Sequence, residues 1–151
     1  MRAVTVRRPL FIVAAVWLGC LTQLTAQPAD APPQSVWSGI YTETQAYRGE
    51  KVADTLCAGC HGAGLEGGDS GPRLVGETFL SAWHNRPVAD LFAYIAQTMP
   101  ENAPGTLKPE EVAAAIAYMF KHNGMPSGRQ ELPAEREALG PAVILATPPS
   151  P

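Results

Sequence analysis

Two cysteines and a histidine stand together in the run Cys57-Ala58-Gly59-Cys60-His61. Two thiols separated by two residues and followed at once by an imidazole are typical of a c-type haem attachment motif. Each thiol can form a thioether bond with one vinyl group of a haem, while the imidazole lies under the iron. The short spacing places both sulfurs on one side of a single helical turn. The run therefore predicts one covalently attached haem c, bound by Cys57, Cys60 and His61.

Two other chemistries use closely spaced cysteines. A structural zinc site needs a second pair of ligands, and the remaining cysteine of the chain is Cys20. A thioredoxin-like dithiol belongs in a βαβ pattern, which the sequence does not show. The residues favour haem attachment, and a haem-free catalytic dithiol is kept as an alternative.

A second axial ligand for the iron is predicted at Met99. Pro100 follows it, and a residue before proline is kept out of the α conformation, so the helix predicted over 87–98 ends there. The methionine is then presented on a loop stiffened by Pro100 and Pro104. A thioether held in this way is a soft ligand that suits haem iron.

Four other side chains are candidates for the same position: His84, His122, Met119 and Met125. Met119 lies on a predicted apolar helix face, which makes core packing its simpler explanation. His122 lies at a predicted helix end, where a cation-capable side chain is favourable. We expect Met99 to be the ligand.

Ligation by His61 and Met99 would close both axial positions of the iron. An iron with both axial positions occupied transfers electrons and does not readily bind oxygen or peroxide. A thioether ligand also favours Fe(II). The pattern therefore predicts an electron-transfer protein with no catalytic residues. The alternative is a haem enzyme or gas sensor in which the sixth ligand is displaceable.

Helical patterns surround the motif on both sides. The predicted helices cover residues 42–56, 77–85, 87–98 and 109–121. Thr42 with Gln45 three residues later matches a capping box at the start of the first helix. Gly49 lies inside that helix at a cost of about 1 kcal/mol relative to alanine, which indicates that a second helix crosses close by.

The segments after the motif are expected to complete the haem site. Residues 62–76 are rich in glycine, so the chain can wrap closely round a flat cofactor. A backbone carbonyl within 71–74 is expected to accept the second N–H of His61 and orient the ring. Trp83 is predicted to donate its indole N–H to a haem propionate, because a buried indole needs an acceptor.

The two ends of the chain differ in composition from its middle. Residues 1–26 are typical of an export signal, because three arginines precede a short apolar run and the segment ends in a small residue. This predicts a periplasmic protein. The residues before Cys20 resemble a bacterial lipobox, and lipidation there would tether the protein to a membrane.

The remaining segments divide into a linker, a domain and a tail. Residues 27–40 have a linker composition rich in proline and alanine. A folded domain that contains the haem motif is predicted over 41–125. Residues 126–151 are again rich in proline, alanine and glutamate, and we expect them to be disordered.

The charge of the chain limits its partners. The formal net charge is −3, from 11 basic and 14 acidic residues. Removal of residues 1–26 takes away Arg2, Arg7 and Arg8 and no acidic residue, which leaves 8 basic against 14 acidic residues, or −6. No basic patch is then available to bind phosphates, so nucleic acid is not expected as a partner. Redox proteins that carry an oppositely charged patch are expected as partners instead.

Several short motifs occur together in an order that resembles the class I c-type cytochromes. They are Cys57-Ala58-Gly59-Cys60-His61, Gly49, Gly71-Pro72-Arg73-Leu74, Met99-Pro100 and Ala117-Tyr118-Met119. The resemblance covers residues 41–124. It implies an all-α fold in which the first and last helices cross around one covalently bound haem.

The resemblance also implies roles for single residues. Gly49 would lie at the helix crossing with Tyr118 packed against it, and Pro72 would supply the carbonyl that orients His61. The family usually has an aromatic residue four positions before the first cysteine, where this chain has Ala53. The last helix usually begins from Ser, Thr or Asp, and here Lys108 precedes Pro109.

A second resemblance concerns partners. Residues 36–42 and 99–105 are similar to cytochrome subunits that accompany periplasmic quinoprotein dehydrogenases. This implies a dehydrogenase as electron donor and an oxidase or another cytochrome as acceptor, although a fold alone does not specify a partner.

Overall fold

A computed structural model describes residues 35–150, which belong to one compact unit. The export signal, Cys20 and the linker up to residue 34 lie outside the described residues. Within 35–150 the chain is helical, with two isolated β-bridges and no strand, and the predicted all-α fold is confirmed. The elements are η1 (Val36–Ser38), α1 (Glu43–Leu56), α2 (Ala58–His61), α3 (Gly76–Trp83), α4 (Val88–Thr98), α5 (Pro109–His122) and η2 (Arg136–Leu139).

Helix α1 delivers the cysteine motif to its place. Thr42 is the N-cap, and its hydroxyl accepts the backbone N–H of Gln45 at 3.1 Å, which satisfies one of the free N–H groups of the first turn. The expected reciprocal contact is absent, because the Gln45 side chain bonds to Leu132 instead. The helix ends at Leu56, so Cys57 follows directly.

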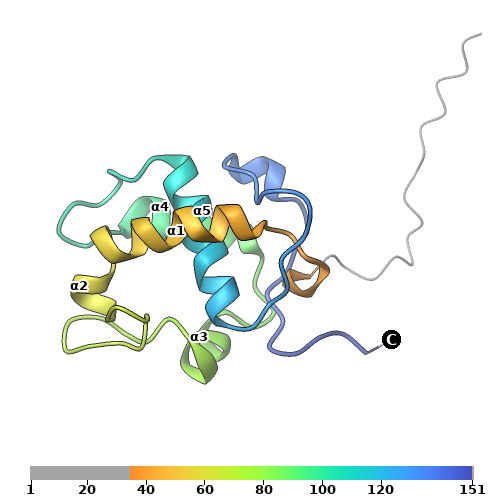
Figure 1. Ribbon diagram of the computed structural model, residues 1–151, viewed down its shortest axis with the longest axis horizontal. Coiled ribbons are helices and arrows are strands. Elements are labelled where there is room, and N and C mark those ends of the chain that lie inside the picture. Colours follow the sequence, from red (N-terminus) through yellow and green to blue (C-terminus); the bar gives the residue numbers. More distant parts are fainter. Residues whose placement is uncertain (1–34, 151) are drawn as a thin grey trace, which may run out of the picture. The chain divides into compact units, whose positions relative to one another are not determined.

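Helices α1 and α5 cross at Gly49 (Figure 1). A Cβ atom built on Gly49 would overlap the Ala114 carbonyl and lie 2.9 Å from Cβ of Tyr118. Only glycine permits this approach, which offsets its unfavourable helix propensity. The crossing joins the helix that carries the cysteines to the last helix of the domain.

Helix α5 begins without a capping hydroxyl. Lys108 occupies the N-cap position, and its backbone N–H donates to the Glu111 carboxylate at 2.8 Å. Pro109 suits the first position of a helix because its missing N–H is not needed there. The helix boundary therefore agrees with the expectation, despite the unusual N-cap residue.

The tail requires a correction. Residues 126–150 were expected to be disordered, yet the structure packs them against the domain. Four apolar side chains of this segment are buried: Leu132, Leu139, Ala142 and Ile144. The segment is rich in proline and mostly irregular, and it buries these four side chains one at a time along its path.

The end of the predicted linker is also part of the domain. Val36 is fully buried, and its N–H donates to the carbonyl of Val143 at 3.0 Å. The Trp37 indole N–H donates to the carbonyl of Leu145 at 2.9 Å. The described part of the linker, residues 35–40, therefore pairs with the tail. No helix within residues 35–150 is long and apolar enough to cross a membrane.

Candidate functional site

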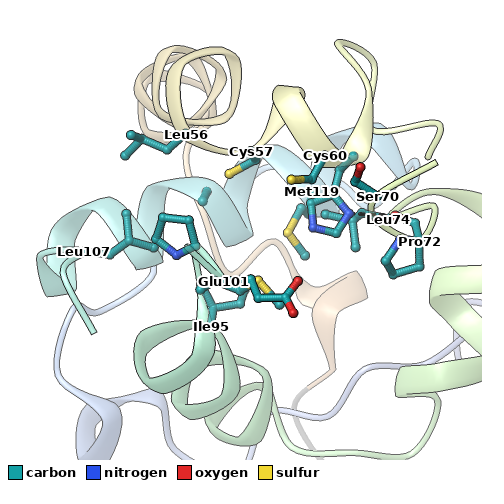
Figure 2. Close-up of a pocket in the computed structure, with 15 residues that line it drawn as sticks. Leu56, Cys57, Cys60, Ser70, Pro72, Leu74, Ile95, Glu101, Leu107 and Met119 are labelled. Atoms are coloured by element: carbon teal, nitrogen blue, oxygen red, sulfur yellow. Dashed lines mark hydrogen bonds between the residues drawn. The ribbon is translucent and has the colours of Figure 1, made fainter. Parts of the chain in front are cut away.

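One largely apolar cavity brings together segments that are distant in the sequence (Figure 2). The empty space inside it is about 700 Å³ when its open mouth is included. Its lining comprises Leu56, Cys57, Cys60, His61, Ser70, Gly71, Pro72, Leu74, Ile95, Met99, Pro100, Glu101, Leu107, Ala115 and Met119. Cys57, Cys60 and His61 of the cysteine motif are thus part of the cavity wall.

The two thiols lie on the same edge of this cavity. Figure 2 shows the sulfurs of Cys57 and Cys60 along the upper side of the cavity, and both are free thiols. The N–H groups of Cys60 and His61 donate to the Cys57 carbonyl at 3.1 and 2.9 Å, so α2 holds the motif in a single tight turn.

The protonation of Cys57 argues against a catalytic dithiol. Burial raises the pKa of the Cys57 thiol, and the neighbouring Cys60 raises it further. Reactive cysteines of redox enzymes show the opposite shift, because the thiolate is the nucleophile. The dithiol alternative therefore lacks the environment that it needs.

A backbone carbonyl holds the His61 ring in one orientation. Its side chain is buried, and Nδ1 lies 2.7 Å from the carbonyl oxygen of Pro72. Because a carbonyl can only accept, Nδ1 carries the proton and Nε2 keeps a free lone pair. A Cβ atom on Gly71 would lie 2.9 Å from Nδ1 and 3.0 Å from Cε1, so the ring fits only because that residue is glycine.

Met99 reaches the cavity from another part of the chain. Its N–H donates to the Ile95 carbonyl at 3.0 Å as the C-cap of α4. Its backbone is extended, with φ −114° and ψ 151°, which is the conformation that a following proline favours. The side chain lines the same cavity as His61.

A second methionine lines the cavity, which the sequence did not lead us to expect. Met119 of α5 is 5% exposed and was assigned to core packing, yet Figure 2 shows it among the cavity side chains. Helical periodicity predicts a buried face but does not distinguish packing against protein from packing against a cofactor. Met119 is thus the control for any test of Met99.

The other candidate axial ligands lie elsewhere, and none of them lines the cavity. Nδ1 of His84 accepts the N–H of Ala146 at 3.2 Å. The ring of His122 packs on Tyr118 with centroids 4.2 Å apart. Met125 is buried in the core.

Trp83 is not brought into the cavity lining. Its ring contacts the guanidinium of Arg86, 4.2 Å from the ring centroid, and the ring of Tyr94, whose centroid is 5.6 Å away. The hydrogen bond from Trp83 to a propionate stays a prediction. Glu101 is the acidic side chain in the lining, and sequence reasoning did not single it out.

The residues present fit a covalently attached haem. Two thiols, an oriented imidazole and a thioether share one cavity whose other lining is mostly apolar. Such a lining suits a flat apolar macrocycle, and these are the ligand types that c-type proteins use. Cys57, Cys60, His61 and Met99 are the residues that would hold the group.

A comparison with known protein families agrees with this site. The family model described as "Cytochrome C oxidase, cbb3-type, subunit III" matches residues 44–119, which is half of the 151-residue chain. No curated protein matches the sequence.

A solved chain is similar to this one at 22% identity and a TM-score of 0.47. It comes from "Crystal Structure of the Sulfane Dehydrogenase SoxCD from Paracoccus pantotrophus". The match covers 67% of this chain and 60% of that chain, so this chain spans less than two thirds of that relative.

The family match includes the cysteine motif, Met99 and the helix crossing at Gly49. The family implies covalently bound haem c, and the cavity has the ligands to hold it. The chain therefore belongs to this cytochrome c family and is a class I c-type cytochrome, a haem protein of electron transfer.

Proposed function

We propose that this chain is a periplasmic cytochrome that binds one haem and carries single electrons from a dehydrogenase to an oxidase or another cytochrome. The observation that carries the proposal is that His61 and Met99, from separate segments, line one apolar cavity together with both thiols. In this proposal the protein converts no substrate itself, and its partners are redox proteins.

Each side chain of the site has a separate role in this proposal. The chemistry that a bound haem supplies is a one-electron change at its iron. Cys57 and Cys60 would hold the group covalently, and His61 would donate Nε2 while Pro72 keeps the proton on Nδ1. Met99 would occupy the opposite axial position and exclude external ligands.

One haem is proposed because the sequence contains one attachment motif. The remaining cysteine, Cys20, has no histidine after it. Mass spectrometry of the intact mature protein should therefore show the mass of the chain plus a single haem. A second haem mass would contradict this part of the proposal.

Export is supported by the composition of residues 1–26. Fractionation of cells that produce the full chain should recover the coloured protein with periplasmic markers. If Cys20 is lipidated, the protein will pellet with membranes and Cys20→Ser will release it. Recovery of coloured protein in the cytoplasm would contradict export.

The ligand assignment is tested with two matched variants. Oxidised wild type should show a low-spin c-type spectrum and the weak near-infrared band of methionine bound to Fe(III). Met99→Leu should lose that band. Met119→Leu should keep it, although this variant also removes a thioether from the cavity lining. Loss of the band in Met119→Leu alone would overturn the assignment.

Carbon monoxide separates electron transfer from the enzyme or sensor alternative. With Met99 bound, the reduced wild type should bind carbon monoxide slowly or not at all, and Met99→Leu should bind it readily. Rapid binding by wild type would favour a displaceable sixth ligand and contradict a purely electron-carrying role.

A further inference from the structure

Residues 132–145, here called the C-terminal strap, are fixed to the domain at two separated places. At the first, the buried Gln45 of α1 donates its amide N–H to the Leu132 carbonyl at 2.8 Å. The Leu132 N–H donates back to Oε1 of Gln45, also at 2.8 Å. This buried pair of bonds attaches the beginning of the strap to α1.

The far end of the strap is attached to the start of α4. The Ile144 carbonyl accepts the N–H of Asn85 at 2.8 Å, and the Ile144 N–H donates to Arg86 at 2.9 Å. The Ala142 carbonyl accepts the N–H of Val88 at 2.9 Å. Val88 is the first residue of α4, and a first-turn N–H has no partner within its own helix.

Between these places, the strap lies along α4 itself. Helix η2 packs against α4, and its Leu139 is 5% exposed. Nε of Arg136 lies 3.4 Å from the Ala89 carbonyl, and the guanidinium lies 3.8 Å from the Asp90 carboxylate. The strap therefore contacts the first turn of α4 and the residues just before it through backbone hydrogen bonds and through the Arg136 side chain, while η2 packs against the same helix.

The other end of α4 carries Met99. The helix has 11 residues, a length of about 16 Å at 1.5 Å per residue. Because a helix of this length moves as one body, fixing its first turn also fixes the direction in which it presents its last. Met99 follows the last turn directly and is bonded to Ile95, which lines the cavity.

We propose that the C-terminal strap is a positioning element for Met99, which acts through α4 and contributes no residue to the cavity lining. The proposal rests on Met99 being the sixth ligand. Its consequence is that a change in the part of the strap that adjoins α4, residues 136–144, should raise the fraction of molecules with Met99 detached, even when the protein remains folded.

The test compares two identical substitutions in the strap of the full-length holoprotein. Leu139→Ala removes a buried side chain of η2, the helix that packs against α4, whereas Leu132→Ala removes a similarly buried one at the α1 attachment. Carbon monoxide association with the reduced protein is measured well below the unfolding transition of each variant. Leu139→Ala should bind carbon monoxide at least about fivefold faster than Leu132→Ala, with a weaker near-infrared methionine band.

A milder variant covers the case in which Leu139→Ala does not fold. Ile144→Val removes one methyl group from a fully buried side chain and keeps the backbone bonds. It should change carbon monoxide binding in the same direction as Leu139→Ala. Equal rates of carbon monoxide association in Leu139→Ala and Leu132→Ala, or a faster rate in Leu132→Ala, would overturn the positioning role. A wild-type protein without the methionine band would instead overturn the ligand assignment itself.

Discussion

The two sides of the cavity are built in different ways. The histidine side is local: residues 57–72 contain both thiols, the imidazole and the carbonyl that orients it. The methionine side depends on distant segments, because Met99 follows a helix whose first residue is hydrogen-bonded to Ala142 and which is preceded by residues hydrogen-bonded to Ile144. The first can be understood from a short motif, whereas the second requires the whole domain.

This difference predicts how each side responds to change. Substitutions on the histidine side should act at the site directly, by removing a bond or displacing the ring. Substitutions that affect the methionine side can lie far from the cavity, and those that loosen only the attachment to α1 should lower stability while leaving the spectrum unchanged. The predictions below follow from the largest to the smallest expected effect.

Loss of both thiols should have the largest effect. In Cys57→Ser with Cys60→Ser no thioether can form, so no haem should stay with the chain under denaturing conditions. Haem staining of a denaturing gel measures this directly, and Cys20→Ser serves as the control that keeps the stain. Retention of stain by the double variant would show that attachment occurs elsewhere.

The close contact beneath the imidazole should have the next largest effect. Gly71→Ala places a Cβ atom 2.9 Å from Nδ1 of His61, so the ring must shift, at a cost of about 3 kcal/mol in unfolding free energy. Gly59→Ala lies within the same motif, and its Cβ atom meets nothing within 4 Å. Denaturant unfolding of the holoproteins should separate the two variants, and equal stabilities would contradict the tight fit.

The attachment of the strap to α1 should affect stability alone. Gln45→Leu leaves the buried N–H and carbonyl of Leu132 without partners and should cost about 2 kcal/mol. The near-infrared band should be unchanged, because α4 is not involved. The exposed Gln97 provides the control Gln97→Leu, which should cost little. Loss of the near-infrared methionine band in Gln45→Leu would show that the α1 attachment of the strap also positions Met99, which contradicts the account.

The smallest effect should appear only in alkali. Burial, with a smaller contribution from Glu43, raises the pKa of Tyr41 from 10.0 to about 12, and its hydroxyl donates to the Met125 carbonyl at 2.7 Å. Between these two pKa values the folded state holds a proton that the unfolded state has lost, so stability falls as pH rises. By pH 11 the loss should be about 1 kcal/mol.

Tyr41→Phe isolates this contribution, because it removes the ionisable hydroxyl, together with its hydrogen bond to Met125, and keeps the aromatic ring. Unfolding free energies of wild type and Tyr41→Phe, measured at several values between pH 8 and 11, should converge as pH rises. A constant difference between them would show that Tyr41 does not titrate in this way.

The local parts of the molecule could be predicted from the sequence. The helix boundaries follow from capping residues, prolines and apolar spacing, and Gly49 indicated the crossing before any contact was known. The cysteine motif identified its own chemistry because the spacing of the two thiols and the histidine is specific.

The parts that could not be predicted depend on contacts between distant segments. Composition alone suggested a disordered tail, since four isolated apolar residues give no periodic signal. Gln45 satisfied the capping-box pattern but is used by Leu132, 87 positions away. Met119 shows the same limit, because a buried helix face does not indicate what it packs against.

The most direct test of the account follows the methionine methyl groups of the reduced holoprotein by NMR. A thioether bound to haem iron holds its methyl group over the macrocycle, where the ring current moves the resonance far upfield. One methyl resonance should lie far upfield of the others, disappear in Met99→Leu and persist in Met119→Leu. A spectrum without such a resonance, or one in which it persists in Met99→Leu, would contradict ligation by Met99.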